Sequence, residues 1–419
     1  MSSGNTIKRI FISDIHMGDE RSVIPGTTFK LPYGWFYDDR PDMLAQFLKY
    51  YIDDKSVEEV VIVGDLFDEW VCPTQVDPTE PNHQEEQFQN IANASQNGPV
   101  IKWLRELASQ QRLVYLRGNH DMLANKVIMA NIFPGIRHLG QDDGHDVYHT
   151  TDGIWAEHGH WYDLFNAPHV PRSGDGFNAS VLPLGFFISR IDAQHVLRTG
   201  KKVTESDVFR DWIDHVHNNV PDSKDPTMDK STHDAIDRTL MDLFNTLVHD
   251  SASDQPGALL NGLDNIPGLV TWQEVTNHYG GIFGQWRANH PNNVSPYDAM
   301  WSDIAGLDQT ANSIFFYKEN TKIIICGHTH KYDLSSTLGP PESTALMPLG
   351  AKHIYANAGA WTNDMSRCTF VETELYSDTG NHIVRLREWT RQIPDGSYIA
   401  RDVLREVGIR GDAWEHRTM

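Results

Sequence analysis

The sequence has few cysteines and no long apolar segment. Its 419 residues include only three cysteines, Cys72, Cys326 and Cys368. Their spacing fits neither a disulfide framework nor a zinc knuckle. No apolar run approaches the length that spans a bilayer, and the N-terminus lacks the apolar stretch of a signal peptide. We therefore expect a cytoplasmic protein without a membrane span.

Positive charge is also scarce. The chain has 35 Lys and Arg residues against 57 Asp and Glu residues, a formal net charge of −22, and no basic cluster. Such a surface repels polyanions, which disfavours nucleic acid as a partner. A small phosphate-containing substrate is still compatible with it, because bound metal ions would reverse the local field. The sequence does not indicate an oligomeric state.

What the sequence does contain is a repeated pattern of apolar segments followed by polar, chemically active residues. Strands are predicted over residues 7–12, 60–63, 113–116, 154–157 and 322–326. Active sites of α/β folds lie where strands end, so we expect the residues that follow to converge at one edge. These residues, in chain order, are Asp14, His16, Asp65, Asn119, His120, His158, His328 and His330.

Their chemistry points to a pair of metal ions. Oxygen and imidazole ligands without thiolate suit manganese, iron, zinc or cobalt. Seven ligating side chains are too many for one ordinary site, but they suffice for two ions if one carboxylate bridges them. Two such ions bind phosphate oxygens and lower the pKa of a bridging water, whose hydroxide attacks phosphorus. His120 adds a group that titrates near neutrality, and Asp121 could hold it in one orientation.

The ordered motifs resemble those of the calcineurin-like metallophosphoesterase superfamily. The superfamily pattern is D-x-H, G-D, G-N-H-D/E, H and G-H-x-H. All five blocks are present in order, as Asp14/His16, Gly64-Asp65, Gly118-Asn119-His120-Asp121, His158 and Gly327-His328-Thr329-His330. The resemblance covers residues 7–160 and 320–390. It implies a metal-dependent phosphoric ester hydrolase of the α/β class, built as a four-layer α/β/β/α sandwich with the site at the strand ends.

The resemblance also implies a role for each matched residue. One ion would be held by Asp14, His16, Asp65 and His330. Asp65 would bridge to a second ion held by Asn119, His158 and His328. His120 would be the acid or phosphate-contacting group, oriented by Asp121. We expect two divalent ions, with manganese as the first candidate and iron, zinc, cobalt or magnesium as alternatives.

A long segment interrupts the pattern of strands. Residues 161–312 carry apolar side chains at helical spacing, and we expect a mainly helical insertion, or cap. It would separate two parts of the core, residues 1–160 and 313–395, with a C-terminal tail at 396–419. A short helix is expected over residues 402–418. Candidate substrate contacts are Arg287, His290 and the aromatic loop near Trp35, for which surface or core roles compete. His160 is a further candidate, with support of the metal ligands as its alternative role.

We expect a phosphodiesterase or pyrophosphatase acting on a small or nucleotide-like substrate. The alternative is a phosphomonoesterase, including a protein phosphatase; a nuclease is disfavoured by the missing basic surface, and a metal-free scaffold by the complete ligand set. Residues 64–70 resemble the branch that cleaves the pyrophosphate of UDP-diacylglucosamine. That branch is shorter and has Arg where His120 stands, whereas an intact GNHD is similar to general phosphodiesterases and phosphatases. The branch's substrate is therefore not carried over.

Overall fold

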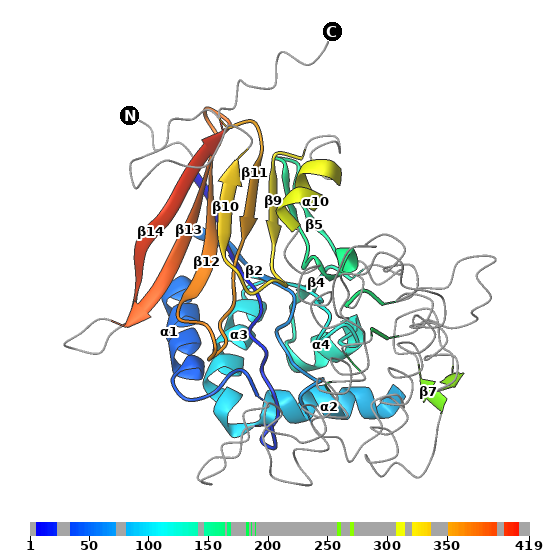
Figure 1. Ribbon diagram of the computed structural model, residues 1–419. Helices are drawn as coiled ribbons and strands as arrows, with labels where there is room; N and C mark the ends of the chain where they lie inside the picture. The colour runs from blue at the N-terminus through cyan, green and yellow to red at the C-terminus, as the bar shows by residue number, and fades with distance from the viewer. Residues whose placement is uncertain are drawn as a thin grey trace, which may run out of the picture.

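Two stacked β-sheets form the centre of the protein, as the computed structural model shows (Figure 1). The structure describes residues 6–22, 34–72, 81–140, 146–163, 166–168, 182–183, 186, 189, 258–260, 269–271, 307–314, 321–336, 351–391 and 398–409. One sheet has the order β14-β13-β12-β1-β2-β3-β4, with β1 (Thr6–Ile12), β2 (Val57–Val63), β3 (Leu113–Leu116), β4 (Arg137–His138), β12 (Cys368–Tyr376), β13 (Asn381–Arg391) and β14 (Tyr398–Ile409). The other has the order β10-β11-β9-β6-β5, with β5 (Tyr148–His149), β6 (Ile154–Ala156), β9 (Ile323–Cys326), β10 (Asp333–Ser336) and β11 (Ile354–Asn357).

The side chains of the apolar strands point alternately into two cores. On β1, Phe11 faces the second sheet, whereas Ile10 and Ile12 face a layer of helices. Strand β9 does the same in the other sheet, where Ile323 and Ile325 point inward between the sheets. Successive residues of a strand point to opposite faces, so a wholly apolar strand fits only a sheet that is covered on both sides.

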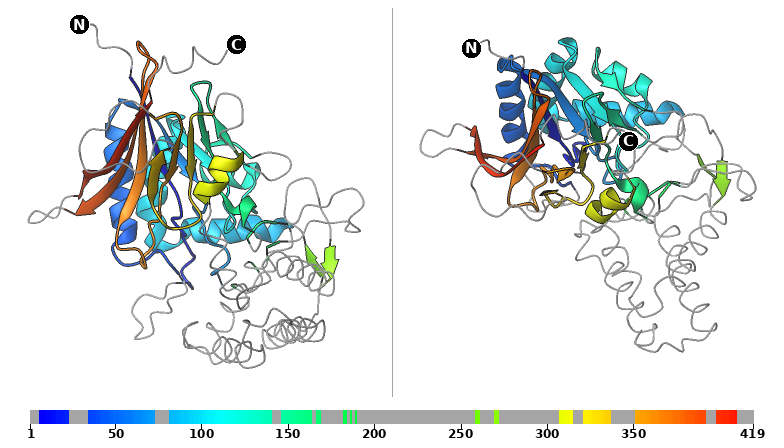
Figure 2. Two further views of the ribbon diagram at one scale, coloured as in Figure 1. Left: turned by 45° about the horizontal axis from the view of Figure 1, so that its top comes forward. Right: turned by 90° about the horizontal axis from the view of Figure 1, so that it is seen from above.

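Helices supply the two outer layers (Figure 2). The seven-stranded sheet packs against α1 (Arg40–Asp53), α2 (Pro81–Asn93), α3 (Gly98–Ser109) and α4 (Lys126–Ile132). The second sheet packs its outer face against α10 (Leu307–Ile314), whose Leu307 and Ala311 contact Ile324 and Cys326. The order helices, sheet, sheet, helix confirms the predicted four-layer α/β/β/α sandwich.

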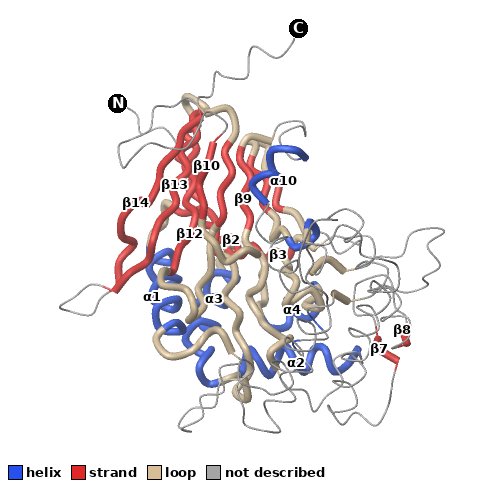
Figure 3. Tube along the Cα trace, in the orientation of Figure 1, coloured by secondary structure: helices blue, strands red, loops and turns tan. Residues whose placement is uncertain are grey.

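Parallel pairing brings the strand ends to one edge. Strands β1, β2 and β3 are parallel neighbours, and β6, β9 and β11 are parallel neighbours in the other sheet. The loops that leave their carboxyl ends gather on one side of the sandwich (Figure 3). The fold therefore assembles loops from distant parts of the sequence into one surface.

The short helix expected within residues 402–418 is wrong over residues 402–409, the part of that segment that the structure describes. Tyr398–Ile409 is instead strand β14, paired antiparallel with β13 at the edge of the large sheet. This part of the predicted tail therefore belongs to the core. The spacing of Val403, Leu404 and Val407 suits a helix, but the edge of β13 offers a hydrogen-bonding partner that local spacing cannot reveal.

Most of the predicted insertion, including Arg287 and His290, lies outside the described residues. The described parts of residues 161–312 include β7 (Ala258–Leu260) and β8 (Leu269–Thr271), which pair antiparallel, and the start of α10. The insertion and its boundaries stay a prediction. Within the described residues, none of the helices has both the length and the apolar character needed to cross a membrane.

Candidate metal centre

Five strand ends deliver the candidate ligands to one place. Asp14 and His16 follow β1, Asp65 follows β2, and Asn119 follows β3. From the facing sheet, His158 follows β6, and His328 and His330 follow β9. The seven predicted ligands are all brought together, from positions as far apart in sequence as His16 and His330, whose Nε2 atoms lie 3.0 Å apart.

The backbone is strained where these ligands stand. Of the seven described non-glycine residues with positive φ, five are candidate ligands, with φ between 52° and 69°: Asp14, His16, Asp65, His328 and His330. Such conformations cost on the order of 1 kcal/mol or more each, and persist only where the surroundings enforce them. Strain concentrated in one cluster of polar residues is typical of a functional site.

Hydrogen bonds between the loops enforce this conformation. The Asp65 carbonyl accepts from the backbone N–H groups of Ile15 and His16, at 2.8 and 2.9 Å. The Asp14 carbonyl accepts from the Trp361 N–H at 3.0 Å. At Gly118 any side chain would collide with the Asp65 carboxylate, which explains the glycine before Asn119.

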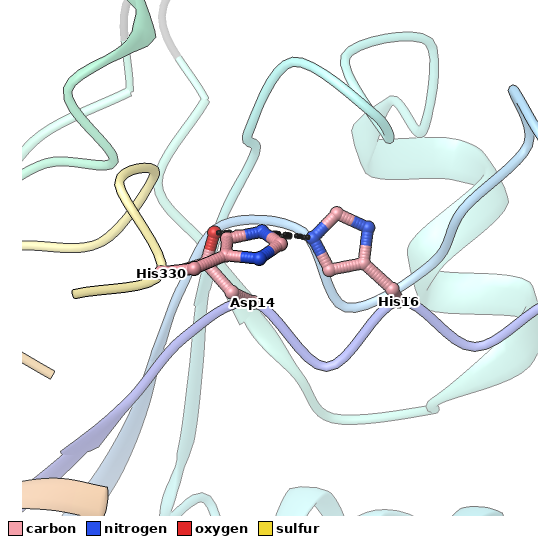
Figure 4. Close-up of side chains that lie close together, drawn as sticks. All are labelled: Asp14, His16 and His330. Atoms are coloured by element: carbon pink, nitrogen blue, oxygen red, sulfur yellow. Dashed lines mark hydrogen bonds and ion pairs between the residues drawn. The ribbon is translucent and has the colours of Figure 1, made fainter. Parts of the chain in front are cut away.

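The first cluster of ligands is Asp14, His16 and His330 (Figure 4). His330 Nε2 lies 3.5 Å from Asp14 Oδ1, and His16 Nε2 lies 3.9 Å from the same oxygen. His16 Nδ1 donates to Asp68 Oδ2 at 2.9 Å, so Nε2 is the nitrogen that would offer a lone pair to an ion. A carboxylate and two imidazole nitrogens directed at one point form a donor set that fits a divalent ion.

The second cluster is built around Asn119. Its Oδ1 lies 3.0 Å from His158 Nε2 and 3.1 Å from His328 Nδ1. His158 Nδ1 donates to the Val63 carbonyl, and His328 Nε2 donates to Asp163 Oδ2 at 2.9 Å. These bonds direct His158 Nε2 and His328 Nδ1 toward the Asn119 oxygen, where each would offer a lone pair to a second ion once that nitrogen is deprotonated.

Asp65 lies between the two clusters. Its Oδ2 is 3.1 Å from His158 Nε2 and 3.6 Å from His16 Nε2. Burial opposes its ionisation, but the imidazoles of His158 and His120 outweigh that effect and hold its pKa well below the usual value. A buried carboxylate that stays charged and faces both ligand sets is placed to bridge two cations.

His120 is held beside the first cluster, but not by Asp121. Its Nδ1 donates to Asp68 Oδ1 at 2.8 Å, and its ring stacks on Trp70 with centroids 3.9 Å apart. Asp121 instead accepts backbone N–H bonds from Gly118 and Leu66, at 2.7 and 2.8 Å. The prediction that Asp121 orients His120 is therefore wrong, because Asp121 ties the loop after β3 to the loop after β2.

Sequence reasoning missed Asp68 and Asp163 as site residues. Asp68 stands three residues after Asp65, in the same loop, and its two oxygens serve two different imidazoles. Asp163 follows His158 by five residues and bonds His328. Each aspartate follows a predicted ligand closely, which is the only signal of these roles that the sequence offers.

His160 lies next to the second cluster. Its ring centroid is 5.4 Å from that of His158 and 6.5 Å from that of His328, and its side chain is buried. It therefore packs among the ligands, and its contact with substrate stays a prediction. The structure does not describe Arg287 and His290.

Comparison with known proteins places the chain in a family. Residues 7–246 match the family model of the calcineurin-like phosphoesterases, a span of more than half the chain. The match includes the candidate ligands from Asp14 to His158, whereas His328 and His330 follow beyond its end. A search of curated proteins finds no match.

Proposed function

The chain belongs to the calcineurin-like phosphoesterases, a family of metal-dependent hydrolases of phosphate esters, and we propose that it cleaves a small phosphodiester or pyrophosphate. The observation that carries this proposal is the placement of His120. A diester has a poor leaving group that gains from protonation as the bond to phosphorus breaks. His120 stands beside the ligand clusters with one ring nitrogen already fixed.

The surroundings of His120 suit a proton donor. Its Nδ1–H is bound to Asp68, which leaves Nε2 as the atom that carries the transferable proton. Burial disfavours the charged form of Asp68, but His120 and His16 lower the pKa of this carboxyl group, so it stays charged and accepts the His120 Nδ1–H. Stacking on Trp70 fixes the plane of the ring. His120 therefore presents a proton in a defined direction.

Two divalent ions, when bound, would supply positive charge for the phosphate oxygens and lower the pKa of a nucleophilic water. The residues that would hold them are Asp14, His16 and His330 on one side and Asn119, His158 and His328 on the other, with Asp65 between. Manganese is the first candidate, because oxygen and imidazole donors without thiolate accept it readily.

A phosphomonoesterase, including a protein phosphatase, is the competing function, because His120 would also protonate a monoester leaving group. The two are separated by hydrolysis of bis-p-nitrophenyl phosphate and p-nitrophenyl phosphate, with added Mn²⁺ and with chelator. We expect metal-dependent cleavage that favours the diester. Preference for the monoester would replace the proposal with the competing function, and activity that survives chelation would contradict both.

The role of His120 is tested by leaving-group dependence. Substituting His120→Asn should slow cleavage of a diester with an alkyl leaving group by about 10²-fold or more, because an alkoxide needs the proton. Loss of p-nitrophenolate, which leaves unprotonated, should slow much less. His149→Asn, at an exposed histidine on β5, is the matched control and should leave both rates unchanged. Equal slowing of both substrates by His120→Asn would show that His120 is not the acid.

A further inference from the structure

An exposed tryptophan stands at the first ligand cluster. The Trp35 side chain is 38% exposed, and few large hydrophobic side chains in the described part of the chain are as open to solvent. Its ring centroid lies 6.4 Å from that of His16 and 6.3 Å from that of His330. An indole that meets both solvent and two candidate metal ligands occupies the approach to the site.

The backbone around Trp35 is held from several directions. The Trp35 carbonyl accepts from the Asn363 N–H at 2.7 Å, and the Asn363 side-chain oxygen accepts from the Tyr37 N–H at 2.7 Å. The next residue, Phe36, is buried in the core, and Gly34 donates to the Ser22 carbonyl. The backbone that carries the indole is thus held by hydrogen bonds, and the indole is exposed from a fixed position.

The same support is continuous with the metal site. Trp361 donates its backbone N–H to Asp14, two residues before Asn363 clamps the Trp35 segment. The planes of Trp35 and His330 are close to perpendicular, at 89°, and those of Trp35 and His16 are tilted by 50°. Neither imidazole is stacked flat on the indole, so neither of these two rings covers an indole face.

We propose that Trp35 is a stacking platform for an aromatic ring carried by the phosphate substrate, and that this ring is a nucleobase. The inference rests on the proposed function, because the ligands His16 and His330 place phosphate beside the indole. A base joined to that phosphate through one sugar would reach Trp35, and stacking of a base on an aromatic side chain is strong and tolerant of base identity. A lipid chain would need a wider apolar surface, whereas the described residues beside the site expose only Trp35 and Tyr332.

The experiment compares three ligands by calorimetric titration of the Mn²⁺-loaded protein: inorganic phosphate, ribose 5-phosphate and adenosine 5′-monophosphate. For the unaltered protein we expect the nucleotide to bind about tenfold more tightly than ribose 5-phosphate. Trp35→Ala should abolish that difference, Trp35→Phe should keep part of it, and phosphate should bind all variants equally. Tyr50→Ala, at an exposed aromatic residue on α1, is the matched control and should keep the full difference.

The outcomes distinguish a failure of the stacking proposal from a failure of the proposed function. If phosphate binds but the nucleotide is no tighter than ribose 5-phosphate, the platform is wrong and the phosphoesterase site stands. If Trp35→Ala weakens phosphate itself, Trp35 supports the ligand loops and does not contact a base. If phosphate fails to bind the metal-loaded protein at all, the proposed function fails and the platform fails with it.

Discussion

The two candidate ion sites differ in their access to solvent. In the first cluster the His330 side chain is 25% exposed, next to the exposed Trp35. In the second, His158 and His328 are 0% and 4% exposed. We therefore expect an ion at the first cluster to exchange with solvent faster than one at the second. The difference lies in His330 alone, because Asp14 and His16 are as buried as His158 and His328.

The two aspartates that bond the site histidines, Asp68 and Asp163, have different partners. Asp68 binds one ligand, His16, and one proposed catalytic group, His120. Asp163 binds a ligand, His328, and accepts from the Asn166 side chain. Positioning groups of this kind set the ring nitrogen that faces the metal. Changing each aspartate therefore tests whether the two sites divide the work as their geometry indicates.

The largest effect is expected from Asp68→Asn. An amide has one acceptor oxygen, so it cannot accept from both His16 and His120 as the carboxylate does. We expect kcat for an alkyl diester to fall on the order of 10²-fold, with a smaller loss of bound metal. Kinetics at saturating Mn²⁺, alongside metal analysis, give both quantities. Full recovery of kcat at high Mn²⁺ would show that Asp68 acts through the ion site alone.

A smaller effect is expected from Asp163→Ala. Without its acceptor, His328 loses the bond that keeps Nδ1 directed at Asn119, and affinity for one ion should fall by roughly 10- to 100-fold. Excess Mn²⁺ should restore kcat, in contrast to Asp68→Asn. Asp163→Asn keeps an acceptor oxygen, so its affinity for the ion should lie between those of the unaltered protein and of Asp163→Ala. Equal loss of both ions on titration with chelator would remove the distinction between the sites.

His382 provides a reference outside the metal centre. Burial lowers its pKa to about 4; Lys322 and Arg9 act in the same direction, and Asp152, 4.0 Å from Nε2, opposes them. The unfolded chain binds a proton near pH 6.5, so the stability from keeping His382 neutral is complete above that pH and is lost as pH falls toward 4. Between pH 7 and 5 the loss is about 2 kcal/mol.

Urea unfolding of the unaltered protein and of His382→Gln measures this effect. The unaltered protein should lose about 2 kcal/mol more than the variant between pH 7 and 5, with or without chelator. A difference that appears only with metal bound would tie His382 to the metal centre and spoil its use as a reference.

The sandwich could be predicted through the family resemblance, and the convergence of the ligands from the position of each after an apolar strand. Wholly apolar strands such as Ile323–Cys326 need cover on both faces. Their side chains are therefore buried alternately in the two cores. The ligands could be predicted because each stands directly after such a strand. Their clustering then follows from parallel pairing, without detailed knowledge of any loop.

The sequence is insufficient where the outcome depends on the path of a loop. Asp68 and Asp121 are both aspartates near His120, and only the turn after β2 decides which carboxylate reaches the ring. Asp121 was the plausible partner by adjacency, yet its oxygens face backbone N–H groups. Likewise β14 depends on pairing with β13, a tertiary contact that overrides a spacing equally compatible with a helix.

The contact between His16 and His330 sets the time at which the protein can become active. The two residues are 314 positions apart, so a growing chain has no complete first site until His330 has been synthesised. Contacts of such long range form late, after local helices and hairpins. Acquisition of the first ion would therefore report that the loops after β1 and β9, which belong to different sheets, have met.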